Sequence, residues 1–255
     1  MEKKETFGAE LAKQLPIKEI YNDVAHPALS TVGEGIKGAV RIALAPISAM
    51  VWGYDKISEY LDKALPEYFE RRKINKEKII QPDPSIAVPV IEAMRYTSHK
   101  DELRIMFTNL LGASMNSDSI DEHPSFIEII KQLSSDECKM IKYLRNHPTM
   151  PMIKIRAIVP DGDGEYDIAP YFSDICYMAG CNYPQKFPEY LDNIHRLGLV
   201  DIHYDRFLTN NEEYEKLKKH PGFPKISIPE DLKSETKSIY CLSEFAKKFC
   251  KVCLD

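Results

Sequence analysis

Apolar residues recur at helical spacing over the long stretch from Ile36 to Leu61, and this periodicity constrains the fold more than any other feature of the sequence. Spacing held for seven turns predicts a long amphipathic helix. Its uncharged part, from Ile42 to Tyr54, is only thirteen residues long, whereas a helix needs about 20 residues to cross a bilayer. We therefore expect the central helix of a soluble bundle, kinked near Pro46 because proline lacks a backbone N–H donor.

Three further helices are predicted after this one, and together they indicate a helical bundle over residues 1–133. The first follows a proline-rich turn in which we expect Ser85 to be the capping residue. A break at Ser98–His99 separates it from the second helix, and the third begins at His123–Pro124.

Residues 134–255 have a different character. Ser134 and Glu137 have the spacing of a capping box, which starts a helix. The following elements are expected in this order: a strand at residues 151–159, a turn at 160–167, helices at 169–181 and 184–197, the second of them ended by Gly198, a strand, a long polar excursion, a last strand and a last helix. This order is typical of a winged-helix domain. The predicted fold class is therefore mainly α, an N-terminal helical bundle followed by an α+β winged-helix-like C-terminal domain.

Winged helices often bind DNA, but the charge of this domain argues against that function. The helix that would enter the major groove carries Lys186 and Arg196 against Glu189 and Asp192. Acidic residues also outnumber basic ones in residues 134–255, and the whole chain has a formal net charge of −5. A DNA reader presents a basic stripe to the phosphates. We therefore favour contact with a protein, or self-association, over DNA as a partner.

Six cysteines raise the question of disulfides or a metal site. The N-terminus lacks the apolar run of a secretory signal, so we expect a cytoplasmic protein whose cysteines are mostly free thiols. Cys250 and Cys253 lie one helical turn apart among apolar residues, which core packing explains. A zinc site that combines them with Cys176 and Cys181 is the less favoured alternative. We predict no metal and no cofactor.

No catalytic signature occurs in the sequence. There is no glycine-rich phosphate loop, no nucleophile elbow and no His-Glu-x-x-His motif. The acidic stretch Asp161–Glu165 superficially resembles a calcium loop, but position 12 of that loop would be Phe172, where an EF-hand has glutamate. A hairpin turn is the simpler explanation of this stretch. We therefore predict that the protein is not an enzyme.

Three long motifs carry a resemblance to a known family: ALAPISAMVWGYDKISEYL, PDPSIAVPVIEAMRYTSHKDELRIMFTNLLGASM and HPSFIEIIKQLSSDE. They resemble the bacterial abortive infection alpha (Abi-alpha) family over about residues 20–145, and the remainder of the chain has a looser likeness to the same proteins. The resemblance implies a role in defence against bacteriophage. It implies no catalytic residues.

The predicted function is non-enzymatic phage defence through protein–protein interaction or a conformational switch. The expected partner is an unidentified protein or phage product, with self-association as a further option. Two alternatives remain open. One is a membrane-active effector that exposes the helix Ile36–Tyr54 on triggering, so that Trp52 and Tyr54 settle at the lipid interface. The other is a winged-helix regulator that binds DNA.

A candidate interaction surface is assigned to aromatic and cationic side chains. Trp52 lies off the main apolar stripe of its helix, so it is either covered by a second layer of the protein, which we favour, or exposed to a partner. A cationic run after residue 70 is usually a solvated face, but it is also suited to an acidic partner. The candidate residues are Trp52, Tyr54, Arg71, Arg72, Lys73, Lys186 and Tyr190.

Overall fold

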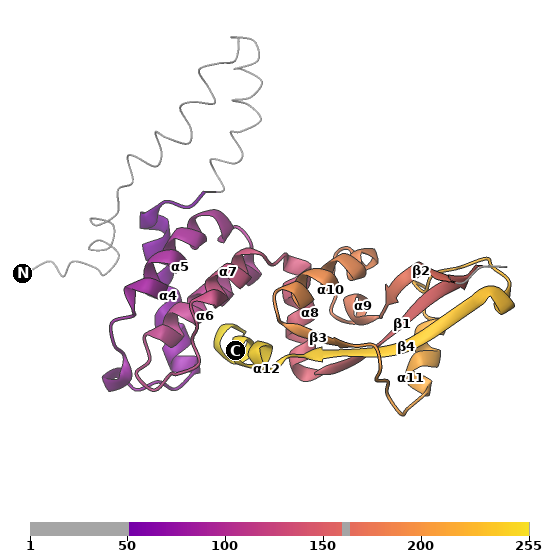
Figure 1. The fold of residues 1–255 in the computed structure, drawn as a ribbon. Helices are drawn as coiled ribbons and strands as arrows, with labels where there is room; N and C mark the ends of the chain where they lie inside the picture. Colours follow the sequence, from indigo (N-terminus) through magenta and orange to yellow (C-terminus); the bar gives the residue numbers. More distant parts are fainter. Residues whose placement is uncertain (1–50, 160–163, 255) are drawn as a thin grey trace, which may run out of the picture. The chain divides into compact units, whose positions relative to one another are not determined.

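The computed structural model describes residues 51–159 and 164–254, so most of the helix predicted over Ile36–Leu61 lies outside the described residues. The chain forms two compact units that divide between Ser119 and Ile120. The architecture is mixed α+β, with helices in the first unit and helices around an antiparallel sheet in the second (Figure 1). In the part of the chain that the structure describes, no helix is long and apolar enough to cross a membrane.

Three helices build the described part of the first unit. They are α4 (Tyr54–Arg71), α5 (Pro84–Thr97) and α6 (Asp101–Ser114), with the short 3-10 helix η1 (Lys76–Lys78) between the first two. Each α-helix contacts the other two. Their apolar faces form a core that includes Ile57, Leu61, Val90, Met94, Met106, Phe107 and Leu110. The predicted break at Ser98–His99 is confirmed, because it separates α5 from α6.

The chain enters α4 differently from the prediction. Residues 51–53 are not helical, so the expectation of one continuous helix through Trp52 is wrong at this point. The backbone of Gly53, the N-cap residue, is extended (φ −72°, ψ 163°). The Trp52 N–H donates to the Arg95 carbonyl of α5 at 2.9 Å. A hydrogen bond to a neighbouring helix therefore replaces the helical bond that the periodicity suggested.

Two local details of the first unit were not foreseen. Asp83, rather than Ser85, caps α5, because its carboxylate accepts the Ser85 N–H at 2.7 Å.

In addition, α6 carries a glycine where the Tyr68 ring of α4 packs. A Cβ atom on Gly112 would lie 2.6 Å from Cε1 of Tyr68, closer than Cβ atoms approach other atoms in real structures. The absence of a side chain at Gly112 thus makes room for the buried ring.

The second unit contains the remaining elements. They are α7 (Ser125–Lys131), α8 (Ser135–Asn146), β1 (Thr149–Ile158), β2 (Glu165–Phe172), α9 (Ile175–Met178), η2 (Pro184–Lys186), α10 (Phe187–Arg196), β3 (Val200–His203), α11 (Glu212–Lys219), η3 (Glu230–Leu232), β4 (Lys233–Leu242) and α12 (Glu244–Cys253). The unit begins before the predicted boundary at residue 134 and includes α7. The reason is that Phe126 of α7 packs against Phe245 and Phe249 of α12, with ring centroids 5.3 Å apart in each pair.

Local signals at two helix ends are confirmed. The Ser134 hydroxyl accepts the Glu137 N–H and the Glu137 carboxylate accepts the Ser134 N–H, which is the predicted capping box of α8. At the end of α10, Gly198 has φ +72°, the left-handed conformation that favours glycine after a helix.

The four strands form one antiparallel sheet in the order β2-β1-β4-β3. β1 and β2 pair with each other, and Ile158 lies opposite Glu165, the last residue of the acidic stretch and the first of β2. The helix predicted at residues 169–181 is wrong over its first part, because Ala169–Phe172 belongs to β2 and only Ile175–Met178 is helical. Pairing with β1 satisfies the backbone hydrogen bonds of this segment, so a tertiary partner overrides the local helical pattern.

Opposite faces of the sheet are covered by different helices (Figure 1). Ile153 and Ile155 of β1 share one face and form a buried cluster with Tyr214 of α11. Met150 points to the other face, because successive strand residues alternate. Its partner on β4 is Tyr240, whose ring lies 5.9 Å from that of Phe187 on α10.

Candidate functional site

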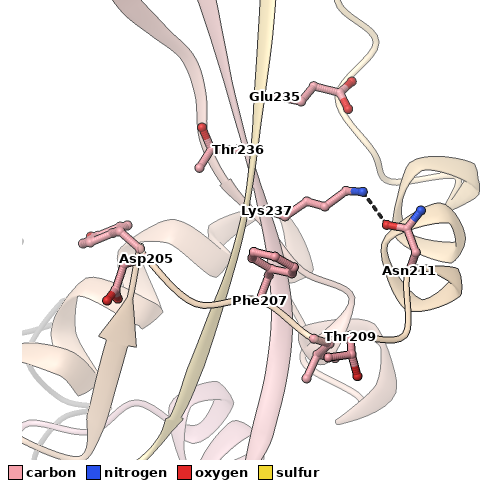
Figure 2. A pocket seen from close by; sticks show the side chains of 9 residues that line it. Asp205, Phe207, Thr209, Asn211, Glu235, Thr236 and Lys237 are labelled. Atoms are coloured by element: carbon pink, nitrogen blue, oxygen red, sulfur yellow. Dashed lines mark hydrogen bonds between the residues drawn. The ribbon is translucent and has the colours of Figure 1, made fainter.

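A pocket of about 590 Å³ lies between β4 and the connection from β3 to α11 (Figure 2). The connection contributes side chains from residues 204–211, and β4 contributes Glu235, Thr236 and Lys237. Phe207 is 64% exposed and Tyr204 is 52% exposed. Two large aromatic side chains are therefore presented to solvent beside a strand of the sheet.

Buried contacts hold this connection in place. Leu208 follows Phe207 and packs against the cluster under α11. The wholly buried Tyr214 hydroxyl accepts the Leu208 N–H at 2.9 Å and donates to the Ser238 carbonyl of β4 at 3.1 Å. Burial raises the pKa of Tyr214, so the hydroxyl stays protonated and can donate. Tyr214 therefore joins the connection to β4, and Phe207 projects from an anchored segment.

Two charged side chains of the pocket, Lys237 and Glu235, contact neighbouring side chains. Lys237 donates a hydrogen bond to the Asn211 side chain, and its Nζ lies 5.4 Å from the Tyr214 ring centroid. Glu235 contacts Lys218 at 2.7 Å and Lys233 at 2.8 Å. Burial acts to raise the pKa of Glu235, but the hydrogen bonds from both lysines outweigh it and lower that pKa. Glu235 is therefore held as a carboxylate.

Tyr204 extends the pocket rim to β2. Its hydroxyl lies 2.7 Å from that of Tyr171, and the two rings are nearly parallel, with centroids 6.4 Å apart. Burial, followed by this hydrogen bond, raises the pKa of Tyr171. The rim is therefore held by contacts to the edge strand of the sheet as well as to β4.

The composition of the pocket suits a protein contact better than a metal. Exposed aromatic side chains flanked by polar and charged groups are typical of interface anchors. Over residues 51–159 and 164–254, no group of three or more His, Cys, Asp or Glu side chains could hold a metal ion. None of the six cysteines, all of which lie in the described residues, forms a disulfide.

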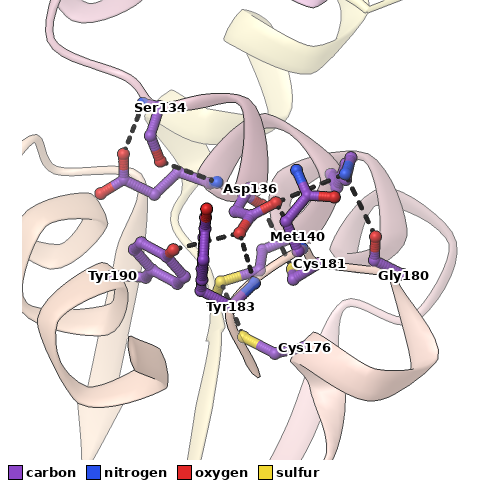
Figure 3. Close-up of polar contacts among 11 residues, drawn as sticks. Ser134, Asp136, Met140, Cys176, Gly180, Cys181, Tyr183 and Tyr190 are labelled. Atoms are coloured by element: carbon purple, nitrogen blue, oxygen red, sulfur yellow. Dashed lines mark hydrogen bonds and ion pairs between the residues drawn. The ribbon is translucent and has the colours of Figure 1, made fainter. Parts of the chain in front are cut away.

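A second polar cluster lies near the start of α8 and ties the segment after α9 to that helix (Figure 3). The Asp136 carboxylate, 4% exposed, accepts the N–H groups of Asn182 at 2.8 Å and Tyr183 at 3.0 Å. It also accepts the Tyr190 hydroxyl at 3.1 Å and pairs with Lys139 at 3.4 Å. Burial acts to raise the pKa of Asp136, but these hydrogen bonds outweigh it and lower that pKa.

Two of the predicted surface residues lie together in the first unit. The Trp52 ring is half-buried, with Lys56 Nζ 4.4 Å and Arg104 Cζ 5.4 Å from its centroid. Tyr54 donates a hydrogen bond to Glu92. Burial and this carboxylate raise the pKa of Tyr54 to about 12. Intramolecular cation–π contacts thus cover part of the tryptophan.

The predicted cationic run is at the end of α4. Arg71 donates to the Asn109 side chain at 2.9 Å, and the guanidinium groups of Arg71 and Arg72 both lie within 6 Å of the Tyr68 ring centroid (5.8 and 5.6 Å). Lys73 is exposed and has φ +54° just after the helix. The two arginines therefore have structural contacts, although Arg71 is exposed, as Lys73 is, and Arg72 is half-buried.

The remaining two candidates differ in burial. Lys186 is exposed and lies 3.9 Å from Glu189. Tyr190 is only 9% exposed, which corrects the expectation that it belongs to an interaction surface. Its position on the inner face of α10 and its hydrogen bond to Asp136 account for this burial.

Sequence reasoning did not identify the pocket. Phe207 falls in the polar stretch between β3 and β4, which was interpreted only as a long excursion. An apolar pair, Phe207–Leu208, between charged and polar residues was the available signal. The sequence could not show that Leu208 packs against the buried cluster whereas Phe207 is exposed to solvent.

A family model described as abortive infection alpha matches residues 54–253. A solved structure of an uncharacterized protein from the hydrocarbon-degrading marine bacterium Alcanivorax borkumensis SK2 is similar at 16% sequence identity, with a TM-score of 0.37. That similarity covers 51% of this chain and 92% of the other. No curated protein matches the chain.

Proposed function

Because this chain belongs to the abortive infection alpha family, we propose that it is a cytoplasmic phage-defence protein that acts by binding another protein rather than by catalysis. The family match over residues 54–253 is the observation that carries the defence role. The expected partner is a phage product or a host protein that changes during infection.

The partner surface in this proposal is the pocket of the second unit. Its support is the pair of exposed aromatic side chains, Phe207 and Tyr204, on an anchored connection. Binding energy at protein interfaces is concentrated in a few aromatic or arginine anchors, and a preorganised anchor loses little entropy on binding. Lys237 adds a cation at the rim that suits an acidic or carbonyl group of the partner.

A winged-helix relationship of the second unit is part of the same proposal. It is supported by the chain order α8, β1, α9, α10, β3, β4 and by the sheet order β1-β4-β3 within the larger sheet. In this interpretation β2 is an added strand, and the segment with α11 takes the place of the wing. Just before α10, Lys186 pairs with Glu189, and at the end of this helix Arg196 contacts Gln132 and Asn193, which favours protein contact over DNA.

Infection assays test the defence role. Cultures with and without the gene should be infected at low and at high phage number while optical density is followed. We expect protection at low number and collapse at high number, because abortive infection sacrifices infected cells to spare the others. Equal curves at both numbers over a broad phage panel would refute the defence role.

A single substitution tests the partner surface. Phe207→Ala should abolish protection while the amount and thermal stability of the protein stay unchanged, since the side chain is 64% exposed. Tyr166→Ala is the matched control, because Tyr166 is a 58% exposed aromatic residue on β2 that does not line the pocket. Full protection by Phe207→Ala would remove the pocket from the proposal and leave the defence role intact.

A further inference from the structure

Helix α9 ends in a Schellman motif that places two cysteines side by side. The Cys181 N–H donates to the Cys176 carbonyl at 2.8 Å, and the Gly180 N–H donates to the Tyr177 carbonyl at 3.3 Å. Gly180 has φ +70°. The residues joined by the outer hydrogen bond of this motif usually have side chains in contact, most often apolar ones. Here both side chains are thiols, and each acts on the pKa of the other.

The two thiols differ in their surroundings (Figure 3). Cys176 is 0% exposed, and its Sγ lies 3.4 Å from the Met140 sulfur. Cys181 is half-buried, and its Sγ lies 3.5 Å from the Asp136 carbonyl oxygen. A reagent in solution therefore reaches Cys181 before Cys176.

The pKa shifts of the two cysteines also make Cys181 the more reactive thiol. The neighbouring Cys176 thiol lowers the pKa of Cys181, and the nearby Lys139 acts in the same direction, against burial and the Asp136 charge. The neighbouring Cys181 group, followed by burial, raises the pKa of Cys176. A reactive cysteine is one that is accessible and carries thiolate character. By contrast, burial raises the pKa of the half-buried Cys241 on β4.

We propose that Cys176 and Cys181 form a peroxide-sensitive dithiol site that closes to a disulfide. The Cys181 thiolate attacks one oxygen of hydrogen peroxide, the O–O bond breaks, hydroxide leaves, and Cys181 becomes a sulfenic acid. The Cys176 thiol then attacks this sulfur. The S–S bond forms as the S–O bond breaks, and the Cys176 proton leaves with the hydroxyl group as water. The two thiols lose two electrons together, and the peroxide gains them.

The disulfide would form next to the contact between α8 and the segment that follows Cys181. The segment that follows Cys181 is held to α8 by Asp136 through the N–H groups of Asn182 and Tyr183. A disulfide between Cys176 and Cys181 would fix the turn from which this segment departs. Oxidation would therefore stabilise the contact between the end of α9 and the start of α8.

Mass spectrometry of the full-length protein tests the proposal directly. The reduced protein is treated with increasing hydrogen peroxide, alkylated and digested with trypsin, which leaves both cysteines in one peptide, residues 157–186. We expect this peptide to lose two hydrogen atoms and to take up no alkylating agent, and a reducing agent to reverse both changes. Cys181 should react about tenfold faster than Cys241, reflecting its larger thiolate fraction.

Variants assign the two roles. Cys176→Ser should leave a sulfenic acid at Cys181 that dimedone traps, whereas Cys181→Ser should leave Cys176 unreacted at the same peroxide concentration. Cys241→Ser is the matched control and should close the disulfide normally. The proposal is overturned if the wild-type peptide keeps both thiols at peroxide concentrations that oxidise Cys241. It is also overturned if Cys181 proceeds to sulfinic acid while Cys176 stays free. Neither wild-type result depends on how the variants fold.

Discussion

Gly112 shows at the scale of one residue how a missing side chain sets a helix contact. We predict that Gly112→Ala destabilises the first unit by about 1–3 kcal/mol, because the new Cβ would overlap the buried Tyr68 ring. Urea denaturation measures the loss. Gly53→Ala is the control, since a Cβ there meets nothing within 4 Å. Equal losses in the two variants would show that the Tyr68 contact does not limit stability.

Asp136 is a buried carboxylate of the second unit that accepts several hydrogen bonds. Asp136→Asn should cost about 2–3 kcal/mol, because the charged acceptor of several buried hydrogen bonds is lost. The corresponding control is Asp192→Asn, which changes an exposed carboxylate on α10. Urea denaturation at pH 7 compares the two variants, and similar free energies of unfolding would contradict the role assigned to Asp136.

The same carboxylate predicts a pH dependence. Its pKa in the folded protein lies below the unfolded value of about 3.9, so its stabilisation is fully present above that value and is lost as the pH falls through the folded pKa. The difference in stability between wild type and Asp136→Asn should therefore be constant above about pH 5 and shrink below about pH 4. The groups that face the carboxylate are Lys139, Tyr190 and the N–H groups of Asn182 and Tyr183. A difference that persists at lower pH would be the contrary result.

At the scale of elements, the connection between β3 and α11 depends on one buried hydroxyl. Tyr214→Phe keeps the ring but leaves the Leu208 N–H and the Ser238 carbonyl without their partner. We expect a loss of about 1–3 kcal/mol and faster amide hydrogen exchange over residues 205–211. Tyr166→Phe, on β2, removes an exposed hydroxyl and should change neither quantity. Unchanged exchange in Tyr214→Phe would mean that apolar packing alone anchors the connection.

Whether an element depends on local or on distant residues also explains which predictions were confirmed. The start of α8 and the end of α10 follow from local features, the Ser134 and Glu137 capping box and the left-handed Gly198. By contrast, Ala169–Phe172 forms a strand only because β1 lies beside it. The exposure of Phe207 likewise depends on residues outside its own segment, namely Tyr214 of α11 and the strand β4.

At the scale of the whole molecule, the second unit has its own buried core and pairs all its strands within itself. We therefore predict that residues 120–255 fold when produced alone, with a cooperative thermal transition and strand signal in circular dichroism. The comparison is residues 134–255, which lack α7 and so leave Phe249 of α12 without Phe126. If only the shorter segment folded cooperatively, the assignment of α7 to the second unit would be refuted.

What the sequence determined by itself is the local part of this protein: the helical periodicity of the bundle, the helix ends marked by Ser134 and Gly198, and the family resemblance carried by long motifs. Only the tertiary structure decided that α4 begins at Tyr54, that Tyr190 is buried over Asp136, and that a pocket forms beside β4. The physical reason is the separation along the chain over which each kind of interaction acts. Helix periodicity and capping act over a few residues, whereas strand pairing, burial of polar side chains and the shape of a surface depend on residues that only the fold brings together.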